Sequence, residues 1–120
     1  MLDIKDSGAC DGTPLQLYDK TQAENQKWVI EDNGYITNPA TGKVIDIKGG
    51  GTGNGTVIQI CFKGGVWTQK FVLDSDGYIT NPQTGKVLDI RGGGTGSGTA
   101  IQLWDKAGVW NQKWVFEEIP

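Results

Sequence analysis

The chain has 120 residues, of which 19 are glycine and 21% are charged, and its formal net charge is −3. This balance predicts one small domain of short elements joined by turns, without a basic surface for nucleic acid or anionic lipid. No apolar stretch reaches membrane-spanning length, so membrane insertion is not expected. Because the chain contains no histidine, a Ser-His-Asp triad and histidine-bound metals are excluded.

Four short strands are predicted in the first third of the chain, because apolar and polar side chains alternate there as in a half-buried strand. They cover residues 2–4, 15–18, 27–30 and 35–37. The third and fourth strands are joined by Asp32-Asn33-Gly34. An Asn-Gly pair supplies the positive φ that a tight hairpin needs.

The same pattern returns twice at an interval of 43 residues, as Asp3, Asp46 and Asp89 show. Residues 44–77 match residues 87–120 at 19 of 34 positions without a gap. We therefore divide one domain, residues 1–120, into repeats 1–43, 44–86 and 87–120. Three repeats of about four strands predict an all-β fold with pseudo-threefold symmetry, the β-trefoil, because three propeller blades are too few to close a ring.

The third repeat is shorter than the other two. It ends after the strand predicted at Trp114-Val115-Phe116 and holds no counterpart of residues 35–43, so its last strand is missing and eleven strands are expected. Either residues 117–120 form that edge, a second copy of the chain covers it, or the chain belongs to a longer protein. An uncovered gap would expose sheet edge and core, which favours a homo-oligomer or a longer chain.

Strand alternation also predicts where a ligand would bind. In the first repeat Asp3, Gln16 and Tyr18 are expected to face outward together, and the pair Asn25-Gln26 follows them. A carboxylate accepts hydroxyl donors, amides both donate and accept, and a flat ring stacks on the apolar face of a pyranose. This constellation of side chains suits a sugar.

The pattern Asp-Ile, Gln-Leu-aromatic and Asn-Gln-Lys-Trp resembles the ricin B-chain-type lectins, also grouped as xylan- and galactose-binding modules. The Gln-x-Trp hallmark of that family stands at residues 26–28 and 112–114, and it is altered to Gln69-Lys70-Phe71 in the second repeat. The resemblance implies a β-trefoil that binds glycans (galactose, N-acetylgalactosamine or related sugars) without a metal or another cofactor. It implies these sugar-binding residues: Asp3, Gln16, Tyr18, Asn25 and Gln26 in the first repeat, and Asp89, Gln102, Trp104, Asn111 and Gln112 in the third.

The second repeat departs from this pattern. It keeps Asp46, Gln59 and Gln69, but Cys61 replaces the aromatic residue and Thr68 replaces the asparagine. The loss of the ring predicts a weak or silent site. In all three repeats the glutamine of the hallmark triplet is expected first to bond backbone in a turn, and the aromatic residue two positions later is expected in the core.

Cys10 and Cys61 occupy different places in the repeat, which indicates two free thiols, although a disulfide between them stays open. Free thiols favour a reducing compartment. The strand pattern that begins at Leu2 leaves no room for a signal peptide, but a trimmed secreted domain would look the same.

The leading hypothesis is a glycan-binding lectin in which several weak sites act together. A second hypothesis is a carbohydrate-targeting module of a larger glycoside hydrolase or toxin. A third, from another class, is a protein-binding trefoil without lectin activity, against which the polar residues kept in two repeats argue. An enzyme is not expected, because glycoside hydrolysis generally needs two carboxylates and each site offers one.

Overall fold

The computed structural model describes residues 1–118, in which only strands and single-turn 3₁₀ helices are present. The strands are β1 (Leu2–Ile4), β2 (Leu15–Leu17), β3 (Val29–Ile30), β4 (Ile36–Thr37), β5 (Val44–Ile47), β6 (Ile58–Cys61), β7 (Val72–Leu73), β8 (Ile79–Thr80), β9 (Val87–Ile90) and β10 (Ile101–Trp104). The 3₁₀ turns are η1 (Lys5–Ser7), η2 (Glu24–Gln26), η3 (Lys48–Gly50), η4 (Trp67–Gln69), η5 (Arg91–Gly93) and η6 (Trp110–Gln112).

The strands form three antiparallel sheets, β1-β2, β3-β4-β5-β6 and β7-β8-β9-β10. In each repeat the first strand pairs with the second in the same register. That register places each aspartate opposite a glutamine: Asp3 and Gln16, Asp46 and Gln59, Asp89 and Gln102. The 43-residue period of the sequence is therefore a structural period.

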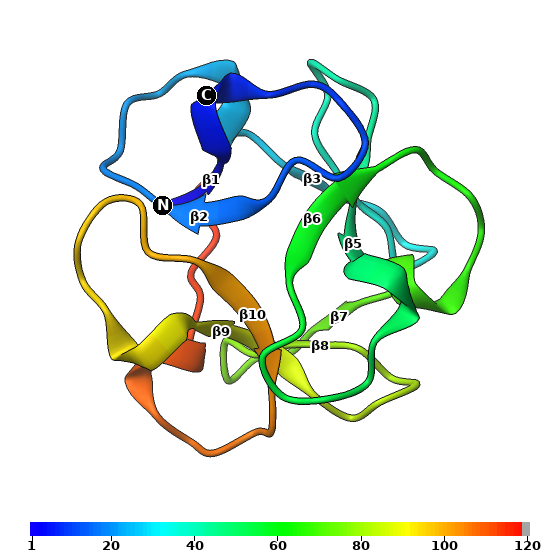
Figure 1. Ribbon diagram of the computed structural model, residues 1–120, viewed down its shortest axis with the longest axis vertical. Helices are drawn as coiled ribbons and strands as arrows, with labels where there is room; N and C mark the ends of the chain where they lie inside the picture. The colour runs from blue at the N-terminus through cyan, green and yellow to red at the C-terminus, as the bar shows by residue number, and fades with distance from the viewer. Residues whose placement is uncertain (119–120) are drawn as a thin grey trace.

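Three lobes surround a common centre, and one strand of each lobe lies beside this centre: β2, β6 and β10 (Figure 1). A backbone N–H of each repeat donates to a carbonyl in the central strand of the next, and the third repeat returns to the first. The bonds are Gly12 to Ile60 and Gly55 to Leu103, both 2.8 Å, and Gly98 to Leu17, 2.7 Å. This closed ring of three repeats is the β-trefoil that the sequence predicts.

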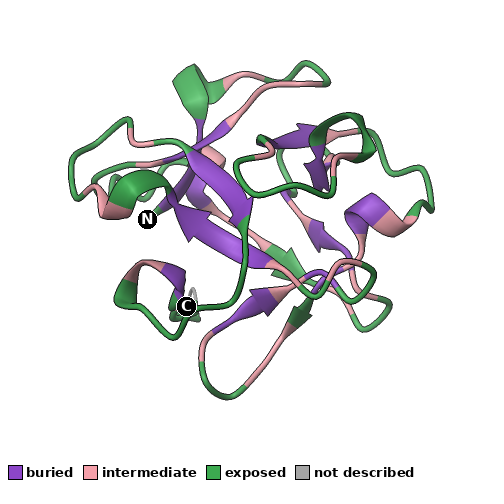
Figure 2. Ribbon diagram, turned by 60° about the horizontal axis from the view of Figure 1, so that its bottom comes forward, coloured by how far each residue is buried: buried purple, intermediate pink, exposed green. Residues whose placement is uncertain are grey.

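The core consists of inward-facing aliphatic residues of the three repeats, which lie in β1, β2, β4, β5, β6, β8, β9 and β10. Figure 2 shows the buried segments gathered in the middle of the molecule. Burying one such side chain stabilises the fold by roughly 1.5–3 kcal/mol. The aromatic residues of the hallmark triplets join this core as predicted: Phe71 is buried, and Trp28 and Trp114 pack against it.

The β3–β4 and β7–β8 hairpins contain the glycines that the sequence analysis expected at positive φ, Gly34 at +96° and Gly77 at +90°. Each turn also touches the next repeat. The carbonyl of Gly34 accepts the N–H of Phe71, and that of Gly77 accepts the N–H of Trp114, both at 2.8 Å. A Cβ on Gly77 would lie 3.0 Å from the carbonyl oxygen of Trp114, so close approach requires glycine there as well.

The third repeat forms two strands within the described residues, β9 and β10, so the structure has ten strands where eleven were expected. The strand predicted at Trp114-Val115-Phe116 was wrong, because its hairpin partner is missing and a strand needs a neighbour to bond. Val115 is accordingly 89% exposed. Residues 117–120 were one of the alternatives for closing the open sheet edge. Glu117 makes an ion pair with Lys20, and residues 119–120 lie outside the described part of the chain.

The seam between the third and first repeats also differs from the other two. A shallow groove of about 350 Å³ lies there, bordered by Tyr18, Asp19 and Ser97. At the other two seams the corresponding place holds a lysine at the end of a repeat: Lys43, whose Nζ lies 2.8 Å from Asp11, and Lys86, whose Nζ lies 2.6 Å from Asp105. The third repeat holds no counterpart of this lysine.

Both cysteines are free thiols, as the sequence analysis favoured. Cys10 is exposed and Cys61 is half-buried. Burial raises the pKa of the Cys61 thiol above its usual value, and the nearby carboxylates of Asp46 and Asp11 act in the same direction. Within residues 1–118, no helix is long and apolar enough to span a membrane.

Candidate functional site

The carboxylate of Asp3 is the centre of the candidate site in the first repeat, which we call site 1. It points away from the aliphatic core, as predicted, but it is only 3% exposed. The expectation that Asp3 and Gln16 present open polar surface was therefore wrong. Gln16 lies across from it on β2 and donates from Nε2 to Oδ1 of Asp3 at 2.9 Å. The second oxygen, Oδ2, accepts from Nδ2 of Asn25 at 3.1 Å and Nε2 of Gln26 at 2.9 Å.

Gln26 ties this carboxylate to the backbone of a neighbouring loop. Its Nε2 also donates to the carbonyl of Asp19 at 2.7 Å, and its Oε1 accepts the N–H of Thr21 at 2.9 Å. The structural role expected for the glutamine of the hallmark triplet is confirmed. Because Gln26 is itself 5% exposed, it contributes to site 1 chiefly by holding the carboxylate and the loop in place.

The η2 turn, which carries Asn25 and Gln26, is held from beneath by Asn38. This fully buried side chain donates from Nδ2 to the carbonyls of Glu24 and Lys27, both at 2.9 Å. The two carbonyls lie at the two ends of η2. In the second repeat Asn81 makes the same pair of bonds to the carbonyls at the ends of η4, at 3.0 and 2.9 Å.

The groups of site 1 that a ligand can reach are the Tyr18 ring and the Asn25 side chain. Tyr18 is 42% exposed at the end of β2, as its predicted outward direction requires. Asn25 is half-buried, and its Nδ2 also donates to the carbonyl of Ile4 at 3.0 Å. Its Oδ1 accepts no bond from the described residues, which leaves one amide acceptor unused.

The third repeat reproduces this arrangement as site 3. Oδ1 of Asp89 accepts from Gln102 at 3.0 Å, and Oδ2 accepts from Asn111 at 3.3 Å and from Gln112 at 3.0 Å. The indole of Trp104 is 39% exposed, in the place of Tyr18. Hydrogen bonds thus bring together the aspartate, the asparagine and the two glutamines of each repeat, and the rings of Tyr18 and Trp104 are exposed at the end of the neighbouring strand.

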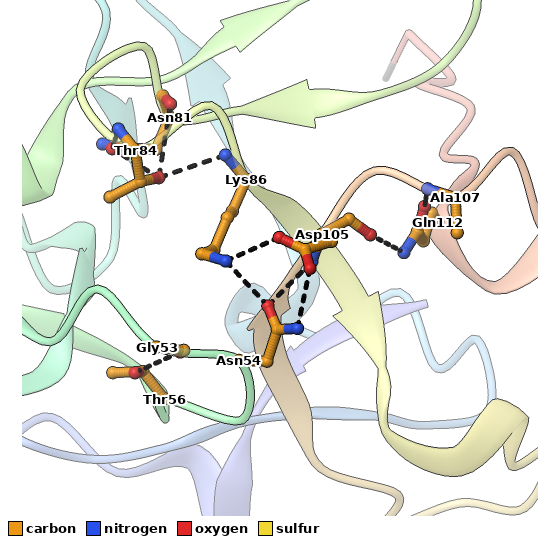
Figure 3. A network of polar contacts seen from close by, with 9 residues as sticks. All are labelled: Gly53, Asn54, Thr56, Asn81, Thr84, Lys86, Asp105, Ala107 and Gln112. Carbon is orange, nitrogen blue, oxygen red and sulfur yellow. Dashed lines mark hydrogen bonds and ion pairs between the residues drawn. The ribbon is translucent and has the colours of Figure 1, made fainter.

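Site 3 is tied to the second repeat by a polar network around Asp105 (Figure 3). The Asp105 carbonyl accepts a hydrogen bond from Nε2 of Gln112 at 2.8 Å, and the Asp105 N–H donates to Oδ1 of Asn54 at 2.9 Å. Its carboxylate meets Nζ of Lys86 at 2.6 Å and Nδ2 of Asn54 at 3.0 Å. The hydrogen bonds from Lys86 and Asn54 hold the pKa of Asp105 below its usual value.

The second repeat keeps the buried carboxylate, but two of the residues expected around it are of other types. Asp46 accepts from Gln59 at 2.7 Å and from the hydroxyl of Thr68 at 2.6 Å. Gln69 bonds the loop backbone, with Nε2 donating to the carbonyl of Phe62 at 2.8 Å. In place of an exposed ring stands the half-buried Cys61. We call this degenerate place site 2.

An ionised carboxylate offers about four acceptor positions. Three are used by amides at Asp3 and Asp89, so at most about one acceptor position of each buried carboxylate is left unused. What the arrangement can do is present a fixed negative charge, an amide and an aromatic face to a polyhydroxylated ring. Among residues 1–118, no group of three carboxylate or thiol side chains is placed to hold a metal ion.

The sequence profile of one protein family matches residues 1–114, and its description is ricin-type β-trefoil lectin domain. The chain belongs to this family. The family confirms the resemblance that the Gln-x-Trp pattern indicated, and with it the prediction of a carbohydrate-binding domain with a threefold repeat. A search among curated protein sequences finds no match.

Solved structures agree with this fold. The chain is 25% identical to the designed threefold symmetric protein ThreeFoil, with a TM-score of 0.84 over 94% of this chain and 86% of that one. It is 30% identical to an exo-β-1,3-galactanase from Clostridium thermocellum, with a TM-score of 0.83, but it covers only 26% of that enzyme. The C-half of an earthworm R-type lectin, solved with GalNAc, is 23% identical with a TM-score of 0.78, over 95% of this chain and 86% of that one.

Two features of the site were missed by sequence reasoning. The first is the role of Asn38 and Asn81, whose signal was available in the repeated Asn-Pro-x-Thr-Gly-Lys motif. The second is the backbone of η1, where Asp6 and Ser7 both have a φ of +54°. The counterparts of Asp6 and Ser7 in η3 and η5 are glycines, so comparison of the repeats could have identified this loop as unusual.

Proposed function

We propose that this protein is a lectin that binds galactose-type glycans through sites 1 and 3. The observation that carries the proposal is the recurrence, in these two repeats alone, of a fixed carboxylate beside an exposed ring and an accessible asparagine. The earthworm lectin C-half, whose structure contains GalNAc, and a bitter gourd homologue of type II ribosome-inactivating proteins, whose structure contains methyl α-galactoside, support this sugar class.

Each site is shallow and offers few hydrogen bonds, so one site should contribute about 4–6 kcal/mol of binding free energy, a dissociation constant between high micromolar and millimolar. Two such sites on one molecule gain effective affinity on a surface that displays many glycans. Site 2 contributes weakly or not at all, because Cys61 and Thr68 supply neither the ring nor the amide.

The proposal is tested by titrating methyl β-galactoside and GalNAc into the protein, followed by NMR or calorimetry. The double variant Tyr18→Ala with Trp104→Ala removes both exposed rings and leaves the buried polar bonds intact. A stacked ring is worth about 0.5–1.5 kcal/mol beyond its buried area, so binding should weaken roughly three- to tenfold at both sites. Unchanged binding in this variant would refute the assignment of sites 1 and 3.

The aspartates are tested against a matched control. Asp3→Ala with Asp89→Ala should abolish binding, but it also leaves buried amides without an acceptor, at about 1–3 kcal/mol for each unsatisfied group. Asp46→Ala makes the same kind of loss in site 2. It should destabilise the fold and leave galactoside binding unchanged.

The targeting-module hypothesis is compatible with the same sites. It is favoured by the galactanase, of which a quarter corresponds to this chain. We also propose that the domain does not hydrolyse glycosides itself, because each site has one carboxylate and hydrolysis generally needs a pair. Turnover of an aryl galactoside by the purified protein that Asp3→Ala with Asp89→Ala abolishes would contradict this.

A further inference from the structure

A small groove lies next to site 1, on the side of Asn25, and its lining is mostly apolar with a few polar side chains. Its volume is about 140 Å³, which is room for one sugar ring. Among the residues that form its walls are Ser7, Gly8, Ala23, Glu24, Asn25 and Ala40. Asn25 thus belongs to both places: its Nδ2 is bonded to Asp3 in site 1, while its side chain borders the groove.

The groove exists because the first repeat carries smaller or more polar residues where the second carries larger ones. Ala23, Glu24 and Ala40 correspond to Val66, Trp67 and Gln83 at the 43-residue spacing. The η2 and η4 turns have the same backbone bonds to a buried asparagine, so the two walls start from equivalent positions.

The most telling of these differences is that between Glu24 and Trp67. In the second repeat the indole of Trp67 is half-buried and packs against the aliphatic core. In the first repeat Glu24 is exposed and its carboxylate turns to Nζ of Lys27 at 2.9 Å. The space beside the turn is therefore left to the groove.

Ser7 supplies a second, independent observation. It holds a left-handed φ of +54°, although its counterparts are glycines with φ of +69° at Gly50 and +66° at Gly93. A non-glycine residue in this region is strained, and such strain is found where the surrounding structure or a function maintains it. The result is a serine in the lining of the groove, at a position where the other repeats have glycine.

We propose that this groove is a second subsite, which binds the sugar unit linked to the galactose-type residue in site 1. The inference rests on the function proposed above and goes beyond it, because it makes site 1 selective for a disaccharide. The Ser7 hydroxyl, the Oδ1 atom of Asn25 and the Glu24 carboxylate offer a donor and two acceptors to the hydroxyls of a second ring. In the second repeat the half-buried indole of Trp67 stands in the place of Glu24.

The test compares methyl β-galactoside with β1-3, β1-4 and β1-6 linked galactose disaccharides in a Trp104→Ala background, which removes the ring of site 3. At site 1 the best disaccharide should bind about five- to tenfold more tightly than the methyl galactoside, the gain from one or two further hydrogen bonds. Glu24→Trp, which installs the residue of the second repeat, should reduce this ratio to about one.

Two further variants keep the result interpretable. Glu24→Gln retains an open groove and most of the hydrogen-bonding capacity, so it should retain most of the preference. Ala40→Gln narrows the groove from the opposite wall and serves if Glu24→Trp is poorly folded. The amide resonance of Ser7 should shift on adding the disaccharide and not on adding methyl galactoside.

A disaccharide preference that survives both Glu24→Trp and Ala40→Gln would overturn the subsite, as would a ratio of one in the Trp104→Ala background. Failure of the methyl galactoside itself to bind would instead overturn the proposed function, and the subsite with it.

Discussion

Asn38 and Asn81 provide a sharp test of how the turns beneath the sites are held. The Asn38 side chain makes four hydrogen bonds: two from Nδ2, and two to Oδ1 from the N–H of Thr41 at 3.1 Å and its hydroxyl at 3.0 Å. Asn81 makes the same four, with Thr84 in the place of Thr41. At a net contribution of about 1 kcal/mol per bond, with some recovered by water, Asn→Ala should cost roughly 2–4 kcal/mol.

A domain of this size has a total stability of about 5–15 kcal/mol, so both variants should still fold. The melting temperature should fall by roughly 8–16 °C in each, taking about 4 °C per kcal/mol for a domain of this length. Binding should separate the two. Asn38→Ala loosens η2, which carries Asn25 and Gln26, and should weaken galactoside binding at site 1 about fivefold, the equivalent of roughly 1 kcal/mol. Asn81→Ala loosens η4, beneath site 2, and should leave binding unchanged.

The assay is thermal unfolding of both variants, followed by galactoside titration at a temperature where each is fully folded, in the Trp104→Ala background so that site 1 is the tighter of the two sites. Equal weakening by Asn38→Ala and Asn81→Ala would show that binding follows global stability and that Asn38 does not position the turn. Unchanged binding in Asn38→Ala would show that η2 needs no support from beneath.

Two further predictions follow from the differences between the repeats. Cys61→Tyr with Thr68→Asn restores to site 2 the ring and the amide that it lacks, so the number of galactosides bound, measured by titration, should rise from two to three; a count that remains at two would show that other parts of site 2 also prevent binding. The lowered pKa of Asp105 means that its pairing with Lys86 stabilises the fold at neutral pH. This contribution is present above the unfolded pKa of about 3.9 and is lost as the pH falls through the lower folded pKa. Asp105→Asn should therefore melt below the parent protein at pH 7 and together with it at pH 2, and an equal difference at both values would contradict the role of the charge.

The fold could be predicted because its determinants recur at a fixed spacing. The pairing of Asp3 with Gln16, the hairpin at Gly34 and the core position of Trp28 each follow from local pattern, and the 43-residue period repeats them. The strand around Val115 was predicted wrongly because its local pattern is that of a strand, whereas strand formation depends on a partner elsewhere in the chain. Local pattern therefore predicts which face a residue presents, but not whether a neighbour is there to bond it.

The limit of local pattern also explains why Asp3 and Gln16 were wrongly expected to be exposed. Alternation correctly predicted that Asp3 points away from the aliphatic core, but not that Gln16 and Gln26 close over it. A side chain opposite the core is exposed only if nothing packs on that face, and here the packing comes from a turn more than twenty residues later. Tyr18 directly follows β2 and Trp104 ends β10. Neither side chain is covered by this turn, so both remain exposed to solvent.

The buried aspartate and glutamine are therefore poor evidence of sugar binding when taken alone. The second repeat retains the pair Asp46 and Gln59, with a bond of 2.7 Å, although it has lost the ring and the amide. A buried carboxylate that is not bonded costs several kcal/mol, and replacing Asp46 would leave Gln59 and Thr68 without their acceptor. The pair can thus persist for structural reasons after a site has ceased to bind. Under the proposed function, the residues expected to distinguish a binding site from a degenerate one are those at the rim, Tyr18 or Trp104 with the neighbouring asparagine, because they are the more exposed ones.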